Sequence, residues 1–302
     1  MRVIKKDVLN NHIKKLSEEK TFILVVKDNA YGFGIELLVE LGMKYGIFMF
    51  AVKNLEEARC VRKCSEKVSI LLLGKLNPKL LNEIIDLNVI PTINDYDDYL
   101  LFKKNHINAH LAIDIGMNRF GVKNGYLAII NDSIVKAIYT HVYEKEALEK
   151  IAWIEDLALR YQKPLHIGGS MAYKHTRATL RVGRMIYEDS LYYYGHIVNI
   201  KSLKKGETVG YDSHFKAESD VLIGVCDVGY SNGLNLFYTG QVAIHDKMYQ
   251  CVGRSCMDQC FILIDEEVSI GDEVEFFGKT IREEYFAKHN QMSRYEVFLN
   301  MV

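Results

Sequence analysis

The sequence predicts an α/β fold: an N-terminal (β/α)8 TIM-like barrel followed by a C-terminal mainly-β domain. Two observations support this. From residue 21 to about 183, short apolar runs alternate with amphipathic segments, as in a parallel sheet whose strands are joined by helices. Near residue 195 the pattern changes to short β-branched runs separated by glycine turns. We therefore predict one domain over 1–194 and a second over 195–302.

Eight apolar runs in the first part are predicted strands: Thr21–Lys27, Ile47–Val52, Val68–Leu73, Asn88–Ile93, Asn108–Asp114, Ile134–His141, Lys163–Gly169 and Thr179–Val182. The segments between them are predicted helices: Ile35–Tyr45, Asn54–Cys64, Asn77–Asp86, Asp95–Lys104, Lys123–Asp132, Glu144–Tyr161 and Ser170–Thr176. Several begin at good N-cap residues, such as Asn54 and Asp95. Eight is the number of strands that closes a barrel, and an open doubly wound sheet is the competing arrangement. The span is below the usual minimum of about 200 residues, so either the helices and loops are short or one of the predicted strands is wrong.

Six short runs in the second part are predicted strands: His196–Ser202, Val221–Val225, Gln241–Ile244, Gln250–Val252, Cys260–Ile264 and Glu273–Phe277. Glycines separate most of them, as in antiparallel sheets with tight turns. No Gly/Ser-rich linker divides the two parts.

The composition argues against several classes of partner. Lysine plus arginine number 38 and aspartate plus glutamate 39, so no net field attracts nucleic acid or an anionic membrane. No apolar run approaches the roughly 20 residues that span a bilayer, and the N-terminus lacks a signal-peptide core, so we expect a cytoplasmic protein. The six cysteines are expected to be reduced, and their spacing does not indicate a metal site.

Polar residues follow the predicted strands at their C-terminal ends. Lys27 ends the first strand, Arg119 follows the fifth, His141 ends the sixth, Ser170 follows the seventh and Arg181 lies in the eighth. Each alone has a structural explanation, such as a surface lysine, a core histidine or an N-cap serine. Functional groups of a (β/α)8 barrel lie at this end of the strands, so together they predict one site.

Four motifs resemble those of the alanine racemase family, and they occur in the family's order along nearly the whole chain. They are Val26–Gly32, Gly116–Gly121, Gly229–Gly233 and Val252–Gln259. The resemblance implies a pyridoxal 5'-phosphate (PLP) enzyme with a barrel and a C-terminal β domain. It implies an amino-acid racemase, and alanine is the substrate that we expect first.

By this resemblance, Lys27 holds the cofactor as a Schiff base and is one of two catalytic bases. Inversion at Cα removes a proton from one face and returns one to the other, so a second base must stand opposite. The resemblance assigns this role to Tyr230, supplied by the neighbouring subunit of a homodimer with shared active sites. A phenol is a weak base near its reference pKa of about 10, so we expect positive charge, from His141 and nearby arginines, to favour its phenolate.

The resemblance also assigns the cofactor and substrate contacts. Arg181 faces the pyridine nitrogen and keeps that nitrogen unprotonated, because an arginine does not readily give up a proton. The phosphate is expected to be bound by Tyr31, Ser170, Gly183 and Arg184. Arg119 is expected to contact the cofactor's phenolic oxygen and the substrate carboxylate, and the backbone of the partner's Met257 to complete the carboxylate site. His141 is counted among the cofactor-binding residues.

Several positions depart from the family pattern. Asp28 stands where a small apolar residue is usual, Gly169 replaces an asparagine, and Asn232 replaces an aspartate. These changes leave alternatives open. One is a racemase for another amino acid, such as serine or a larger or charged one. Others are a decarboxylase on a related barrel and a PLP-binding protein without turnover.

Overall fold

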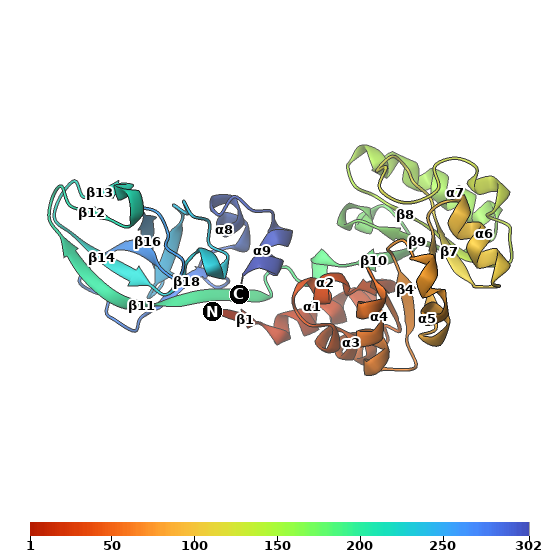
Figure 1. Ribbon diagram of the computed structural model, residues 1–302, viewed down its shortest axis with the longest axis horizontal. Coiled ribbons are helices and arrows are strands. Elements are labelled where there is room, and N and C mark those ends of the chain that lie inside the picture. The colour runs from red at the N-terminus through yellow and green to blue at the C-terminus, as the bar shows by residue number, and fades with distance from the viewer. Residues whose placement is uncertain (302) are drawn as a thin grey trace. The chain divides into compact units, whose positions relative to one another are not determined.

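A computed structural model describes residues 1–301 and divides into two compact units (Figure 1). One unit comprises residues 10–186. The other combines residues 1–9 with the chain from Tyr187 onward.

The first unit is built around parallel strands. They are β2 (Phe22–Val25), β3 (Met49–Val52), β4 (Ser69–Leu72), β5 (Val89–Ile90), β6 (Thr92–Ile93), β7 (Ala109–Ala112), β8 (Val135–His141), β9 (Leu165–Gly168) and β10 (Thr179–Val182). Their order in the sheet is β5-β4-β3-β2-β10-β9-β8-β7-β6. Because only Pro91 separates β5 from β6, the two ends of this order are one interrupted strand, and the sheet closes on itself. The predicted eight-stranded barrel is confirmed, and the open sheet is excluded.

Pro91 explains why the predicted strand Asn88–Ile93 is split. Proline has no N–H to give to a ladder, which confines it to edges and irregular positions. Its carbonyl still accepts the His110 N–H at 3.0 Å, so the chain stays attached to β7 through the interruption.

The helices of this unit lie around the strands (Figure 1). They are α1 (Lys6–Glu19), whose first residues belong to the other unit, α2 (Lys27–Tyr31), which is a left-handed turn, α3 (Ile35–Lys44), α4 (Leu55–Cys64), α5 (Leu81–Asp86), α6 (Tyr96–Lys104) and α7 (Ile151–Arg160). Single 3-10 turns supplement them: η1 (Pro78–Leu80), η2 (Tyr126–Ala128), η3 (Glu146–Lys150), η4 (Ser170–Lys174) and η5 (Arg184–Ile186). Across residues 1–301, no helix is long and apolar enough to cross a membrane.

Short connections explain how the barrel fits into so few residues. The predicted helix Lys123–Asp132 is wrong except for the single turn η2, because Val122 pairs with Ile113 and Gly125 adopts a left-handed φ of 81°. The predicted helix Ser170–Thr176 is likewise the 3-10 turn η4. Helix α1 was not predicted.

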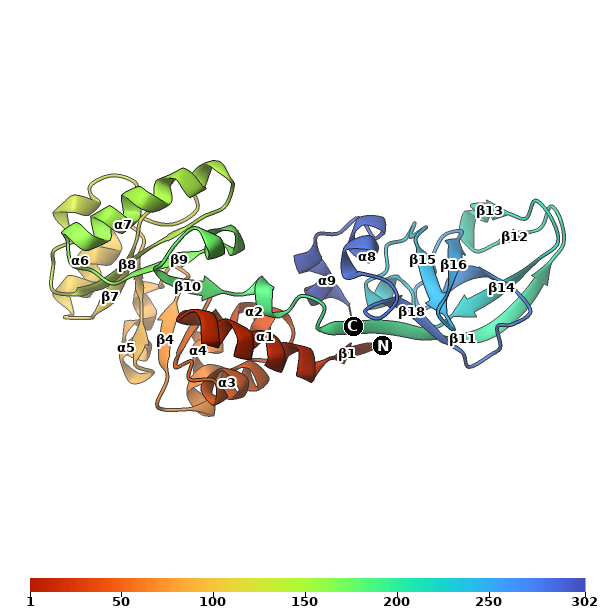
Figure 2. The same cartoon turned by 180° about the vertical axis from the view of Figure 1, so that it is seen from behind.

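The second unit is a closed antiparallel sheet, which confirms the predicted mainly-β domain. Its strands are β11 (Leu191–Leu203), β14 (Val221–Cys226), β15 (Gln241–Ile244), β16 (Lys247–Val252), β17 (Cys260–Ile264) and β18 (Glu273–Phe277). A small hairpin, β12 (Thr208–Val209) with β13 (Phe215–Lys216), stands apart from it. The order β11-β14-β17-β16-β15-β18 closes because β18 also pairs with β11, the long strand that runs along this unit (Figure 2).

The N-terminal strand β1 (Arg2–Ile4) also belongs to this unit. It pairs antiparallel with β11 in the register Arg2↔Tyr193 to Ile4↔Leu191. Lys5 continues the attachment, since its backbone N–H donates to Ser190 O at 2.7 Å and its Nζ to Gly278 O at 2.7 Å. The two ends of the chain therefore meet in one unit although they lie far apart in sequence.

Two helices that the sequence analysis did not predict follow the last strand. They are α8 (Glu283–His289) and α9 (Arg294–Asn300). Helix α9 begins with a capping box in which Ser293 Oγ accepts the Glu296 N–H and Glu296 accepts the Ser293 N–H. Phe286 of α8 packs on the ring of Phe277 with centroids 4.9 Å apart.

Glu283, at the start of α8, is a buried carboxylic acid with one unsatisfied oxygen. Oε1 accepts from Arg294 Nε at 3.1 Å, whereas Oε2 has no hydrogen-bond partner in the described part of the chain. Burial raises the pKa of Glu283 to about 7, against the lowering effect of Arg294, and Asp189 and Glu188 add to the rise. The folded unit therefore holds a proton that the unfolded chain releases above its ordinary pKa of 4.5.

This predicts a loss of stability as pH rises from about 4.5 to about 7, because in that window only the folded state keeps the proton. Glu283→Gln removes the titration. We expect the free energy of unfolding of Glu283→Gln relative to the natural protein to increase by about 1 to 3 kcal/mol between pH 4.5 and 8. Calorimetric unfolding across that range measures it.

Glu284→Gln is the matched control, since Glu284 lies next in α8, is solvent-exposed and contacts Arg294 Nη1 at 2.7 Å. It should show no comparable change with pH. A difference in unfolding free energy between Glu283→Gln and the natural protein that does not change with pH would contradict the prediction.

Candidate active site

Lys27 lies where β2 leaves the barrel sheet. The preceding residue, Val26, makes the last ladder bond, from its N–H to Ala51 O at 2.9 Å. The Lys27 side chain is half-buried, and its Nζ lies 5.8 Å from the ring centroid of Tyr31. The amine is therefore held at the C-terminal mouth of the barrel, as the sequence predicted for a functional group.

The chain after Lys27 makes a left-handed turn. Asp28, Asn29, Ala30 and Tyr31 have φ values of 54°, 51°, 53° and 55°. This region costs an L-residue roughly 1 to 2 kcal/mol, although aspartate and asparagine tolerate it better. Hydrogen bonds within the turn offset that cost: the Ala30 N–H donates to Val26 O at 2.8 Å and the Gly32 N–H to Asp28 O at 2.9 Å.

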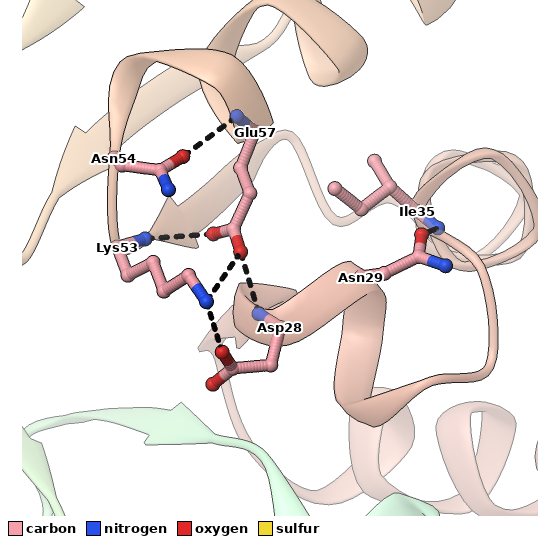
Figure 3. Close-up of polar contacts among 6 residues, drawn as sticks. All are labelled: Asp28, Asn29, Ile35, Lys53, Asn54 and Glu57. Atoms are coloured by element: carbon pink, nitrogen blue, oxygen red, sulfur yellow. Dashed lines mark hydrogen bonds and ion pairs between the residues drawn. The ribbon is translucent and has the colours of Figure 1, made fainter. Parts of the chain in front are cut away.

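Glu57, at the start of α4, clamps this turn from outside (Figure 3). Its Oε1 accepts the Asp28 N–H at 2.6 Å and its Oε2 accepts the Lys53 N–H at 2.9 Å. The Asn54 side chain caps the helix by accepting the Glu57 N–H at 2.9 Å. The carboxylate thus continues the β2–β3 ladder beyond its end and fixes the backbone on the far side of Lys27.

Two further contacts in Figure 3 support the same segment. Lys53 Nζ forms an ion pair with Asp28 and lies 3.7 Å from Glu57 Oε1. Asn29 Oδ1 accepts the Ile35 N–H at 3.1 Å and so caps helix α3. The Asp28 pair is exposed and contributes little, so Glu57 is the main support. The sequence analysis missed Glu57, although Asn54-x-x-Glu57 is a recognisable helix start.

Arg181 is buried inside the barrel and held by neutral acceptors. Its Nη1 bonds to His166 Nδ1 at 2.8 Å, and its Nη2 donates to Thr140 O at 2.9 Å. The guanidinium also lies 4.2 Å from the ring centroid of Tyr139. Burial lowers the pKa of Arg181 to about 10, helped by the positive charge of Arg119, so it remains protonated at neutral pH.

His141 and Gly168 complete this side of the mouth. A β-carbon at Gly168 would lie 2.5 Å from Arg181 Nη2 and 2.6 Å from His141 Nδ1, so both side chains pack against the glycine backbone. Burial, followed by Arg181 and Arg119, lowers the pKa of His141 to about 4. The expectation that His141 supplies positive charge is therefore wrong at neutral pH, and the arginines supply it.

Three of the four predicted phosphate-binding residues follow β9 or β10, and the fourth, Tyr31, belongs to α2. Ser170 and Gly183 line one small cavity with Gly169. A β-carbon at Gly183 would lie 2.5 Å from the Tyr31 hydroxyl, so that hydroxyl reaches the same backbone. Arg184 follows directly in η5.

Arg119 lies on an exposed loop that returns to β7. Asp114 Oδ1 accepts the N–H groups of Gly116 and Asn118 at 2.9 and 3.2 Å, and the Val122 N–H donates to Ala112 O at 2.8 Å. Arg119 is close enough to lower the pKa of both His141 and Arg181 by its charge. Its loop follows the C-terminal end of β7, the same end of the barrel strands at which Lys27 follows β2.

Tyr230 and Met257 lie in the other unit, and the backbone brings them together. The Tyr230 N–H donates to Cys256 O at 3.0 Å and the Ser231 N–H to Met257 O at 2.9 Å. Both side chains are exposed, at 44% and 55%. Asn232 Oδ1 accepts the Gly229 N–H at 3.0 Å, so the amide at this divergent position holds the turn that carries Tyr230.

A test of the Glu57 clamp follows from its geometry. Glu57→Gln leaves one oxygen but turns an N–H2 group toward the second amide. We expect it to destabilise the barrel unit by about 1 kcal/mol, because one partly buried N–H loses its acceptor. Hydrogen exchange of the Asp28 and Lys53 amides should accelerate.

Glu56→Gln is the matched control, one residue away on the exposed side of α4. It should change neither the stability nor the exchange of these amides. Equal behaviour of the two variants would contradict a clamping role.

Comparisons with known proteins agree with this arrangement. The family described as alanine racemase, N-terminal domain, matches residues 7–190, and the alanine racemase C-terminal domain matches 191–302. The chain is 29% identical to the alanine racemase of Helicobacter acinonychis (89% of this chain, 86% of the relative). It is 26% identical to that of Borreliella burgdorferi (96% and 91%).

A solved structure shares the fold. The alanine racemase of Bartonella henselae, determined with covalently bound pyridoxal phosphate, superposes with a TM-score of 0.91 at 20% identity. The superposition covers 100% of this chain and 96% of the other. Because both family domains match in order over nearly the whole sequence, the chain belongs to the alanine racemase family.

Proposed function

We propose that this protein is a PLP-dependent amino-acid racemase that interconverts L-alanine and D-alanine. The observation that carries the proposal is one barrel mouth that holds both the Lys27 amine and the buried Arg181 guanidinium. Membership of the alanine racemase family and relatives named alanine racemase support the reaction and the substrate.

The residues at the mouth fit the cofactor. Gly168 and Gly183 lack the β-carbons that would collide with Arg181, His141 or Tyr31, so these side chains pack directly against bare backbone at the mouth. The donors gathered there, an amine, a guanidinium and hydroxyls, are of the kinds that suit the aldehyde, ring nitrogen and phosphate of PLP. Ser170 and Gly183 line one small cavity at the ends of β9 and β10. PLP, when bound, withdraws electrons from the amino acid attached to it and so acidifies the α-C–H bond.

Two bases are required because inversion takes a proton from one face of Cα and returns one to the other. Lys27 would hold the cofactor covalently, and its ε-amine would move a proton at one face of Cα. The phenol of Tyr230 serves the opposite face. Arg181 would be the donor to the pyridine nitrogen, and it keeps its own proton at neutral pH, since its pKa is about 10.

The remaining roles concern orientation. Tyr31, Ser170, Gly183 and Arg184 hold the phosphate. Arg119 orients the substrate carboxylate together with the backbone of Met257, and His141 packs beside Arg181 as a neutral imidazole.

Lys27 and Tyr230 belong to different units of the chain, and we propose that they meet across an isologous homodimer, one from each subunit. The exposed Tyr230 and Met257 side chains are suited to such a shared site. Action in the cytoplasm remains an expectation from the sequence.

The decisive experiment follows α-proton loss by NMR in heavy water for a panel of L-amino acids with the cofactor-loaded protein. We expect exchange for alanine, with appearance of the D-enantiomer. Exchange confined to serine or to a larger amino acid would show that this amino acid, and not alanine, is the substrate. Cofactor binding without exchange would overturn the racemase proposal.

Variants separate the two bases. Lys27→Ala should reduce racemisation at least about 1,000-fold. Tyr230→Phe should abolish inversion yet still permit exchange from the one enantiomer whose proton Lys27 removes. Tyr211→Phe, a change at an exposed tyrosine of the same unit, should leave the rate unchanged.

Mixing Lys27→Ala with Tyr230→Phe subunits tests the shared site. A heterodimer contains one site with both bases intact, so partial activity should return. No recovery in demonstrated heterodimers would contradict a site shared between subunits.

A further inference from the structure

The barrel has a second cavity at the end of the strands opposite Lys27. It measures about 550 Å³, within the range of small-molecule sites. Its wall is formed by residues at the N-terminal ends of the strands, including Ile23, Met49, Ser69, His110 and Leu165. All of its lining residues belong to the barrel unit.

A hydrogen-bonded chain connects this cavity to Arg181. Arg181 Nη1 bonds to His166 Nδ1 at 2.8 Å, and His166 Nε2 bonds to His110 Nδ1 at 2.9 Å. Both imidazoles are neutral, because burial first and the charge of Arg181 second lower the pKa of His110 to about 4 and that of His166 well below its ordinary value.

The tautomers of His166 and His110 follow from two facts: both imidazoles are neutral, and Arg181 can only donate. A guanidinium only donates, so His166 Nδ1 must accept and His166 carries its proton on Nε2. That proton is donated to His110 Nδ1, which leaves the single proton of His110 on Nε2. The series of hydrogen bonds therefore runs in one direction, from Arg181 through His166 to His110, and ends on the His110 Nε2–H donor.

This last donor faces the cavity. His110 is 7% exposed and lines the cavity. Within residues 1–301 its Nε2 makes no hydrogen bond, and this atom is not completely enclosed by protein. A buried donor without an acceptor is costly unless a ligand or water satisfies it. The cavity thus presents one directed N–H at a largely apolar surface.

The charges around the cavity favour an anion. Lys20 and Lys136 are among its lining residues, and none of those lining residues is acidic. The Lys20 ammonium is held in place by the carbonyl of Thr176 at 2.8 Å. An occupant with an apolar body gains from Ile23, Phe48 and Leu165, and its acceptor group gains from His110.

We propose that this cavity is a binding site for a small monocarboxylate with an apolar body, whose carboxylate accepts the His110 Nε2–H. The ligand class combines the three features of the cavity: apolar walls, one N–H donor and a positive rim. The carboxylate of the ligand extends the series of hydrogen bonds that begins at Arg181. We therefore expect His166 to respond to ligand binding together with His110.

The test uses the cofactor-loaded protein with 15N-labelled histidine and sodium octanoate as the probe. Before addition, two-dimensional NMR should show His110 and His166 as Nε2-protonated neutral imidazoles. Octanoate should shift the His110 Nε2–H resonance saturably, with Kd of about 1 mM or tighter. The His166 signals should move in the same titration, whereas those of His141, which has no bond to this chain, should not.

Two other probes separate the parts of the ligand. Octan-1-ol lacks the charge and should bind about tenfold more weakly. Acetate lacks the apolar body and should not saturate the shift. Equal binding of octanoate and octanol would overturn the carboxylate assignment.

Variants locate the site. Ser69→Trp fills the cavity from its rim and should abolish octanoate binding, and Leu159→Trp, on the exposed face of α7, should not. His110→Phe removes the donor and should reduce octanoate affinity to that of octanol. Should His110→Phe fail to fold, Ser69→Trp still decides. No saturable His110 shift, or binding that Ser69→Trp leaves unchanged, would overturn the proposal.

Discussion

The buried guanidinium charge of Arg181 constrains the residues that pack around it inside the barrel. Moving an unpaired guanidinium out of water costs several kcal/mol, so Arg181 requires acceptors that carry no competing protons. Thr140 O and His166 Nδ1 meet this requirement, and His166 can do so only as a neutral imidazole in one tautomer. Gly168 leaves the space that Arg181 and His141 occupy. The tautomers and the bare glycine backbone depend on this one charge, and it adds to burial in keeping the histidines neutral.

The reactive lysine is positioned by a different device. Lys27 has flexible methylenes, so its amine is placed only as well as its backbone is held. That backbone lies between the last β2–β3 ladder bond, at Val26, and the Glu57 clamp, at Asp28. The left-handed turn that follows stores strain which the clamp and the internal hydrogen bonds offset. Here Asp28, the residue that departs from the family pattern, adopts a conformation that aspartate tolerates better than alanine.

The small size of the barrel also has a physical origin. Four-residue strands are enough for many of the parallel pairings, and single 3-10 turns replace helices after β7 and β9. One strand is even interrupted at Pro91 without opening the sheet, since the Pro91 carbonyl still bonds to His110. Closure tolerates these reductions because each strand has a neighbour on both sides, so no long edge is exposed.

The sequence alone determined the class of fold, and it predicted which residues follow the barrel strands at one end. Alternating apolar and amphipathic segments predict a barrel, and a lysine, an arginine and a histidine at strand ends predict a site, because these patterns are local. It did not reveal β1, whose partner β11 lies about 190 residues away, nor Glu57, whose acceptor role depends on two strand ends meeting beside a helix. Nor did it reveal that His141 is neutral or that His110 joins Arg181 to a second cavity. Desolvation and hydrogen-bond direction arise only when residues distant in sequence are packed together, so tertiary structure alone decided them.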